Sequence, residues 1–178
     1  MIWAVVPAKG YGHAKSRLAG AMTPHQRHRL ARQLFLHVAS TSAEVVDRVA
    51  VLTDSPEVAA DAYALGALVL PDRRQGLAAV IDDGLAALQG DRALVLMADL
   101  PDVTAAALRR LMRHPSAAVP DHHGTHTNAL WTTLPAPPTC FGPDSLARHA
   151  RRFPIVPVPA LALDIDVPAD LRRDRPGA

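Results

Sequence analysis

Short apolar runs alternate along the chain with amphipathic stretches of helical length. The apolar runs are continuous and lack the alternation of apolar and polar residues that is typical of a strand with one face in water. Strands of this kind are buried on both faces, which requires helices on both sides of a parallel sheet. The pattern therefore predicts an α/β domain with a mainly parallel central sheet, with strands at residues 2–8, 49–53, 67–70 and 93–98 and a weaker one at 116–120.

Residues that favour helix starts stand between these runs. Thr23, followed by Pro24 and Gln26, is typical of a capping box with proline in the first turn. Ser55 and Thr104 are N-cap candidates for two further helices. We expect helices that begin near residues 24, 56, 77, 105 and 145, and a short helix with a frayed end in the last dozen residues.

Beyond about residue 120 the pattern changes. The polar turn "HGTHTN" leads into the apolar "ALWTTL", which predicts a strand. The segment "LALDIDVP", residues 161–168, is typical of a buried strand except for Asp164 and Asp166. Alternate residues of a strand share a face, so these two carboxylates would point the same way. Such a pair needs either a cation beside it or an exposed edge strand.

Composition narrows the class of protein. The chain has 178 residues, of which 49% are hydrophobic and 20% charged, which suits one globular domain and excludes disorder over most of the length. No apolar run approaches the roughly 20 residues of a membrane span, and the opening does not fit a signal peptide. The single Cys140 cannot form an internal disulfide. We therefore expect one cytoplasmic domain over residues 1–171, with a short C-terminal tail over 172–178.

The basic residues are distributed unevenly. The formal net charge is only +2, aromatic residues make up 4%, and the arginines are scattered along predicted helices, so we expect no nucleic-acid partner. Of the 19 basic residues only two are lysines, Lys9 and Lys15, and both lie in the loop after the first strand. A coding bias toward arginine explains the arginines but not this clustering. A compact ammonium group has uses that a planar guanidinium does not serve as well.

Charged residues follow the predicted strands at the point where each strand ends. Lys9 follows the first strand, Asp54 the second, Asp72 the third and Asp99 the fourth. Ligands of parallel sheets bind at these carboxyl ends. If the two aspartates near the end of the chain join Asp99, three carboxylates form an oxygen-rich site for a hard cation such as Mg²⁺.

The loop after the first strand contains Lys9, Lys15 and Arg17 together with Gly10 and Gly12. A glycine-containing loop between a strand and a helix can bring backbone N–H groups and a lysine to phosphates. The spacing matches neither a Walker motif nor a dinucleotide fingerprint. Carboxylates that bind a metal opposite a lysine loop suit phosphoryl or nucleotidyl transfer.

His122, His123 and His126 raise the question of a zinc site. We do not favour one, because only Asp121 accompanies them as an acidic ligand at the usual spacing and no cysteine does. Two segments are instead candidate anion sites, the turn "GTHTN" and the stretch before a helix that contains Gly142 and Ser145.

Taken in order, several segments resemble the guanylyltransferases that activate 2-phospho-L-lactate or phosphoenolpyruvate for the deazaflavin coenzyme F420. The segments are "VVPAKGYGHAKSRLAG", "MTPHQRHRLA", "QGLAAVIDDGLA", "LVLMADLPDVT", "HGTHTNAL", "FGPDSLARH" and "LALDIDVPADL". The resemblance implies a single nucleotidyltransferase domain with a Rossmann-like sheet, of the nucleotide-diphospho-sugar transferase type. It implies transfer of GMP from GTP to the phosphate of a small phosphorylated carboxylic acid, with release of pyrophosphate and with Mg²⁺ as cofactor. A homodimer is an open alternative to a monomer.

The resemblance also implies roles for individual residues. Asp99, Asp164 and Asp166 would bind Mg²⁺ and, with Lys15, form the catalytic group. The nucleotide would contact Lys9, Lys15, Arg17 and Gly76, and the acceptor would contact Thr127, Gly142 and Ser145.

Three positions depart from the family pattern. His122 stands in place of an arginine, His126 in place of a glycine, and Ala78 in place of an asparagine. A β-carbon at position 126 restricts a backbone conformation that glycine permits. Two alternatives therefore stay open: a related nucleotidyltransferase with another acceptor such as 3-phosphoglycerate, and an inactive paralogue that binds a nucleotide.

Overall fold

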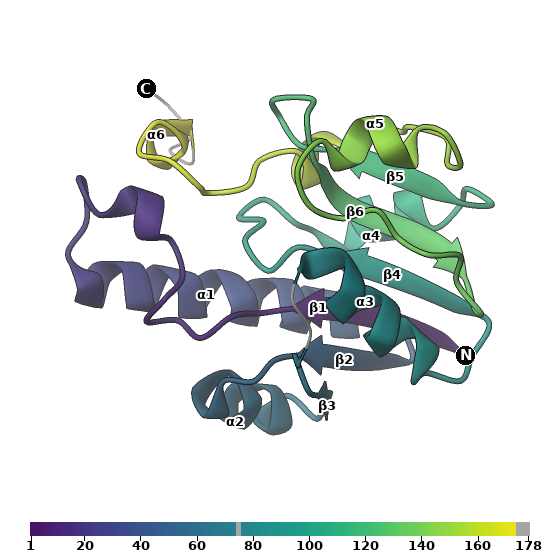
Figure 1. The fold of residues 1–178 in the computed structure, drawn as a ribbon, viewed down its shortest axis with the longest axis horizontal. Helices are drawn as coiled ribbons and strands as arrows, with labels where there is room; N and C mark the ends of the chain where they lie inside the picture. The colour runs from purple at the N-terminus through teal and green to yellow at the C-terminus, as the bar shows by residue number, and fades with distance from the viewer. Residues whose placement is uncertain (74–75, 174–178) are drawn as a thin grey trace.

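The central element of the fold is one six-stranded sheet (Figure 1). The structure is a computed structural model that describes residues 1–73 and 76–173. The strands lie in the order β3-β2-β1-β4-β6-β5. Strand β6 is antiparallel to both of its neighbours, β4 and β5, and the other described strands all run in one direction. The predicted mainly parallel sheet is confirmed, with strands β1 (Ile2–Pro7), β2 (Arg48–Leu52), β3 (Leu68–Leu70), β4 (Arg92–Leu96), β5 (Ala117–Pro120) and β6 (Thr127–Thr133).

Helices cover both faces of this sheet. Side chains of α1, α2 and α4 pack with Ala4 and Val6 of β1, whereas those of α3 pack with Trp3 and Val5 on the opposite face. The alternation within β1 explains its continuous apolar sequence, since both of its faces are buried. The helices are α1 (Pro24–Ala43), α2 (Pro56–Ala64), α3 (Leu77–Ala86), α4 (Ala105–Leu111), α5 (Ser145–His149) and α6 (Asp170–Arg173), with 3₁₀ turns η1 (Ser16–Leu18) and η2 (Pro159–Leu161).

The predicted helix caps are confirmed. The Thr23 hydroxyl accepts a hydrogen bond from the Gln26 backbone N–H at 3.3 Å, and the Gln26 side chain accepts one from the Thr23 N–H at 2.8 Å. The hydroxyls of Ser55 and Thr104 accept bonds from the third residue of their helices in the same way. These short-range contacts satisfy backbone donors that a helix start leaves free, so the helix starts follow from local sequence.

Helix α3 approaches the sheet closely at Gly84. A β-carbon there would lie 2.7 Å from Cδ2 of Leu52 on β2. Real β-carbons do not approach other atoms so closely, and the leucine is buried in the sheet. Glycine at this position therefore lets α3 lie against β2.

The prediction of a strand over residues 161–168 is wrong. Turn η2 ends at Leu161, and residues 163–166 form no helix or strand. Leu163 and Ile165 are buried with Leu18 and Leu34, whereas Asp164 and Asp166 are less buried. The segment thus keeps the alternating burial of a strand without pairing in a sheet.

The backbone bonds of this segment explain why it is not a strand. The Ala162 carbonyl accepts a bond from the His122 N–H at 2.8 Å, and the Ile165 N–H donates to the Asp99 carbonyl at 3.3 Å. The Asn128 side chain donates to the carbonyls of Leu161 and Ala162. Loops and a side chain therefore take the place of a neighbouring strand, and they hold the segment beside the end of β4.

The described residues close with α6, which continues to Arg173 and thus includes the start of the predicted tail. Residues 174–178 of that tail lie outside the described part of the chain. Among the described residues, no helix combines the length and the apolar character needed to cross a bilayer.

Candidate active site

The candidate site is a cleft of about 500 Å³ at the carboxyl ends of β1 and β4. Of the ten predicted site residues, Gly76 does not line it; Gly76 is the N-cap of α3 and directly precedes Leu77, which does. Asp54 and Asp72, which follow β2 and β3, do not line it either. The other nine predicted residues line this one cleft: Lys9, Lys15, Arg17, Asp99, Thr127, Gly142, Ser145, Asp164 and Asp166.

Three carboxylates converge at one end of the cleft. Asp99 follows β4, and Asp164 and Asp166 come from the irregular segment before α6. One oxygen of each lies within 4.8 Å of the others. Ligands at adjacent corners of an octahedral Mg²⁺ lie about 3 Å apart, and Mg²⁺ usually retains several waters. The three oxygens therefore suit a hard divalent cation that binds some of them directly and others through water.

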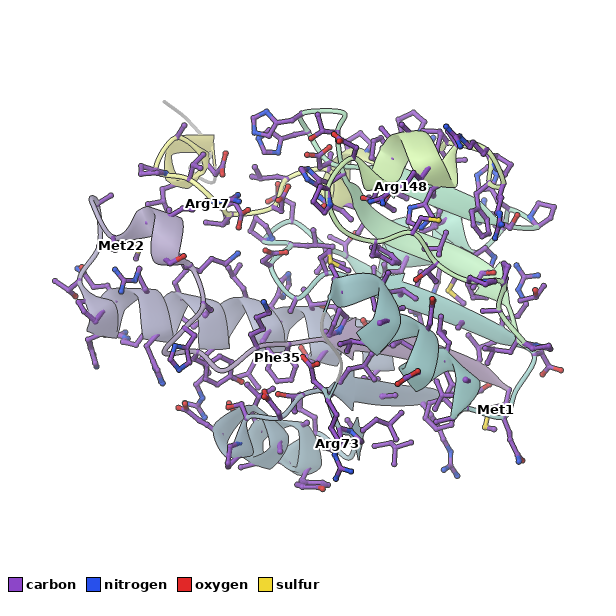
Figure 2. All side chains as sticks on the ribbon, in the orientation of Figure 1. Met1, Arg17, Met22, Phe35, Arg73 and Arg148 are labelled. Atoms are coloured by element: carbon purple, nitrogen blue, oxygen red, sulfur yellow. The ribbon has the colours of Figure 1, made fainter. Side chains whose placement is uncertain are left out.

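Two basic side chains of the loop after β1 lie against these carboxylates. The Lys15 Nζ atom is 2.5 Å from Asp99 and 3.5 Å from Asp166, and its side chain is only 7% exposed. Arg17 also contacts Asp166, at 3.0 Å, and lies near α6 (Figure 2). Lys15 also has a left-handed backbone with φ 58°, a conformation that costs about 1 kcal/mol or more for a residue with a β-carbon. The fold thus holds this ammonium group at the carboxylates.

Asp164 has the least favourable environment of the three carboxylates. Its burial, followed by the negative charge of Asp99, raises its pKa above the ordinary value. A hydrogen bond from the Asn128 amide at 3.3 Å opposes this shift only in part. Burial of one carboxylate beside another costs free energy that a bound cation would recover.

The other end of the cleft presents hydroxyl groups. Ser145 Oγ accepts a hydrogen bond from the Thr127 backbone N–H at 3.0 Å. The Thr127 hydroxyl lies 2.9 Å from Nδ1 of His149, and the Cys140 backbone N–H donates to Nε2 of the same ring at 3.2 Å. We call this chain of hydrogen bonds, from Cys140 through His149 to Thr127, the His149 relay.

The direction of the His149 relay follows from its first bond. A backbone N–H can only donate, so Nε2 of His149 accepts and the neutral ring carries its proton on Nδ1. Burial of the ring lowers the pKa of His149 to about 4, which keeps it neutral near pH 7. Nδ1 therefore donates to Thr127. Because protein N–H groups already use lone pairs of both hydroxyl oxygens, Thr127 and Ser145 can each donate a hydrogen bond to an anion in the cleft.

Gly142 lies beside these hydroxyls with φ 120°, a conformation that side chains with a β-carbon rarely adopt. The residue lines the cleft between Phe141 and Pro143. Its backbone turns the chain from the wall of the cleft into α5, where Ser145 is the first residue. The glycine thereby positions the Ser145 hydroxyl.

The three departures from the family pattern lie in different surroundings. His126 lines the cleft with 54% of its side chain exposed, and its Nδ1 is 2.8 Å from the Thr125 hydroxyl. His122 lies outside the cleft, between the carboxylates of Asp164 and Asp170. Ala78 is not among the lining residues of the cleft. Only His126 is therefore placed to contact an acceptor directly.

Sequence reasoning missed Asn128 and His149 as parts of the site. Asn128 anchors the segment that carries Asp164, and His149 orients Thr127. Both lie within the quoted segments "HGTHTNAL" and "FGPDSLARH", so the signal was present. Their roles require knowledge of contacts between distant segments.

The fold and the cleft define the class of protein: an α/β domain of the nucleotidyltransferase type, with its site at the carboxyl edge of a mainly parallel sheet. A putative nucleotide-diphospho-sugar transferase from Desulfovibrio desulfuricans G20 has a similar fold, with a TM-score of 0.71 over 96% of this chain and 84% of that one. Sequence identity to it is 15%, so this likeness concerns the fold alone.

The chain belongs to the family described as "Guanylyl transferase CofC like", whose sequence model matches residues 2–141. A phosphoenolpyruvate guanylyltransferase of Chloroflexus aggregans is 35% identical over 97% of this chain and 96% of its own length. Another, from Sphaerobacter thermophilus, is 38% identical over 94% of this chain and 89% of its own length. These two relatives extend the similarity beyond residue 141 to nearly the whole chain.

Proposed function

We propose that this protein transfers GMP from GTP to the phosphate of a small phosphorylated carboxylic acid, phosphoenolpyruvate or 2-phospho-L-lactate, and releases pyrophosphate. The observation that carries the proposal is the convergence of nine predicted residues on one cleft, with carboxylates and lysine at one end and hydroxyl donors at the other. Membership of the guanylyl transferase family supports it, as do relatives named phosphoenolpyruvate guanylyltransferase.

Mg²⁺ is the cofactor that we propose for the carboxylate end, with Asp99, Asp164 and Asp166 as its ligands. When bound, it would neutralise charge on the triphosphate and on the departing pyrophosphate. The raised pKa of Asp164 and the grouping of three carboxylate oxygens support this assignment.

Lys9, Lys15 and Arg17 supply the positive charge for the triphosphate. Arg17 is 72% exposed, so its guanidinium can leave Asp166 and turn toward a phosphate at little cost. Lys15 is held more firmly by its burial and its two carboxylate partners. We assign Lys15 to the phosphate nearest the carboxylates and Arg17 to a more exposed one.

Thr127 and Ser145 hold the acceptor by donating hydrogen bonds to its carboxylate or phosphate oxygens. An acceptor phosphate oxygen then attacks the α-phosphorus of GTP, the bond from that phosphorus to the bridging β-phosphate oxygen breaks, and pyrophosphate leaves. The second pKa of a phosphate ester is about 6, so the nucleophile is ionised at neutral pH and needs no general base. Catalysis then depends on positioning and charge stabilisation.

A related nucleotidyltransferase with another acceptor is the second candidate. The observation that favours it is His126, which places an imidazole on the wall of the cleft. Replacement by glycine should then change the relative rates with phosphoenolpyruvate, 2-phospho-L-lactate and 3-phosphoglycerate.

The test is pyrophosphate release from GTP with each of the three acids in the presence of Mg²⁺. We expect release with phosphoenolpyruvate or 2-phospho-L-lactate, and its loss in Asp99→Asn. Asp102→Asn is the matched control, because Asp102 is an exposed aspartate of the same loop that lies outside the carboxylate group. If no pyrophosphate is released with any of the three acids, or if the two variants are equally active, the proposal is refuted.

A further inference from the structure

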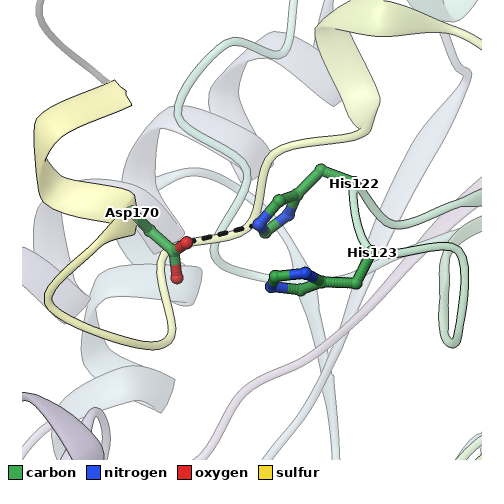
Figure 3. A group of neighbouring side chains, drawn as sticks. All are labelled: His122, His123 and Asp170. Atoms are coloured by element: carbon green, nitrogen blue, oxygen red, sulfur yellow. Dashed lines mark ion pairs between the residues drawn. The ribbon is translucent and has the colours of Figure 1, made fainter.

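A second group of potential metal ligands lies outside the cleft. His122 and His123 are adjacent in the turn after β5, and Asp170 is the first residue of α6. One ligand atom of each lies within 4.8 Å of the others. Figure 3 shows both imidazole rings directed from the turn toward the Asp170 carboxylate. We call these three residues the His-His-Asp cluster.

His122 is the member that most needs a ligand. Its side chain is only 10% exposed, and within residues 1–73 and 76–173 neither ring nitrogen has a hydrogen-bond partner. A buried polar nitrogen without a partner costs free energy. The ring points Nε2 at Asp170 Oδ1, 3.3 Å away, which is close but outside hydrogen-bond geometry. A ligand between the two atoms would satisfy both.

The spacing of these atoms fits a tetrahedral metal ion. Zinc lies about 2.0–2.2 Å from nitrogen and carboxylate ligands, so two of its ligands are about 3.4 Å apart. The 3.3 Å between Nε2 of His122 and Oδ1 of Asp170 matches this separation. The His123 ring lies beside that of His122, with centroids 3.8 Å apart and planes tilted by 40°, and His123 is exposed, so it can rotate to supply a third ligand.

Neighbouring groups hold the ligands in place. Asp170 Oδ2 accepts bonds from the backbone N–H groups of Asp166 and Val167, at 2.9 and 2.8 Å, which leaves Oδ1 for His122. Nδ1 of His122 lies 3.4 Å from Oδ1 of Asp164. Once Nε2 binds a metal, Nδ1 carries the proton and can donate to that carboxylate, an arrangement common for metal-bound histidines.

We propose that the His-His-Asp cluster binds a divalent transition-metal ion, with Zn²⁺ the best fit, and that water completes a tetrahedral site. Two imidazoles and one carboxylate are a typical ligand set for this ion. The ion would tie α6 to the turn of residues 121–126 and thereby fix the segment that carries Asp164 and Asp166. Local spacing alone does not favour zinc, but here the acidic ligand, Asp170, comes from a distant segment.

The test uses Co²⁺ and Zn²⁺ with the whole chain, after treatment with a chelator and in excess Mg²⁺ to occupy the carboxylates of the cleft. Tetrahedral Co²⁺ absorbs visible light much more strongly than octahedral Co²⁺, so the spectrum reports the geometry. We expect one Co²⁺ per chain with a tetrahedral spectrum, displaced by one equivalent of Zn²⁺. His123→Ala should weaken binding at least tenfold, and so should Asp170→Asn, which retains an oxygen to accept the two backbone bonds.

His37→Ala is the matched control, because His37 is an exposed histidine of α1 away from the cluster. It should bind Co²⁺ as the parent does. Absence of stoichiometric binding, an octahedral spectrum, or equal affinity in His123→Ala would overturn the proposal. The metal titration does not depend on guanylyl transfer, so it stands whether or not the protein has that activity.

Discussion

Acidification tests the His149 relay, because the fold keeps this ring neutral. Its pKa is lowered from 6.5 to about 4 by burial, and the ring is 1% exposed. Above pH 6.5 the ring is neutral in both the folded and the unfolded chain. Between pH 6.5 and 4 only the unfolded chain binds the proton, so the free energy of unfolding falls as the pH falls. Protonation of His149 in the folded state would place an Nε2–H donor opposite the Cys140 N–H donor and break the hydrogen bond between them.

The size of the effect follows from the shift. One unit of pKa difference corresponds to about 1.4 kcal/mol, so the change from 6.5 to about 4 removes about 3 kcal/mol once the pH falls below the lower value. A drop from pH 7.5 to 4.5 should remove about 2–3 kcal/mol. Such a loss is a large fraction of the 5–15 kcal/mol typical of a folded domain.

The assay is urea unfolding at pH 7.5 and 4.5, followed by fluorescence of Trp3 and Trp131. His149→Gln serves as the comparison, because glutamine can accept the Cys140 bond but does not titrate. The variant should be less stable than the parent at pH 7.5 and should lose about 2–3 kcal/mol less on acidification. Other titrating groups lower the free energy of unfolding of both proteins equally, so their contribution cancels in the difference between the two. If the free energy of unfolding falls by the same amount in the two proteins between these pH values, the inference that the fold keeps His149 neutral is wrong.

Three further substitutions test other parts of the account. Asp164→Asn should abolish turnover yet stabilise the metal-free protein by about 1 kcal/mol, because it removes repulsion from neighbouring carboxylates; a lower metal-free Tm would contradict this. Lys15→Met should raise the KM for GTP at least tenfold while the KM for the acid changes less; an unchanged KM for GTP would remove Lys15 from the triphosphate site. Gly84→Ala should destabilise the fold by about 1–3 kcal/mol in urea unfolding, because its β-carbon would meet Leu52 at 2.7 Å; a stabilised variant would show that α3 can shift.

Local chemistry explains which parts of the fold are predictable from sequence. The caps at Thr23, Ser55 and Thr104 act within three residues, so the starts of their helices follow from the sequence around them. The continuous apolar strands predict a parallel sheet because both faces of β1 are buried. The antiparallel direction of β6 follows from the short turn of residues 121–126, which joins it to its neighbour β5 as in a hairpin.

The segment of residues 161–168 shows where this reasoning fails. Buried and less buried residues alternate in it, as in a strand, because Leu163 and Ile165 pack inward. Its backbone partners come from loops and from Asn128 instead of a strand. Periodicity reports burial, whereas strand pairing depends on partners distant in the sequence.

Some residues of the candidate site can likewise be predicted from the sequence, and others cannot. Asp99 could be predicted because a carboxylate at the end of an apolar strand is conspicuous, and Asp164 and Asp166 because they interrupt an apolar run. The role of His149 could not, since this residue of α5 acts through Thr127, which belongs to β6 and is distant in the sequence. The same holds for His122 and Asp170, which meet only because α6 lies against the turn after β5.

The central claim is that GMP is joined to the phosphate of the acid, and the ³¹P NMR spectrum of the product tests it most directly. The protein would be incubated with GTP, phosphoenolpyruvate and Mg²⁺, and the same reaction would be run with 2-phospho-L-lactate. We expect two mutually coupled phosphorus signals from a new diphosphate linkage in at least one reaction, together with free pyrophosphate. Unchanged GTP with both acids, or GMP as the only new nucleotide, would contradict it.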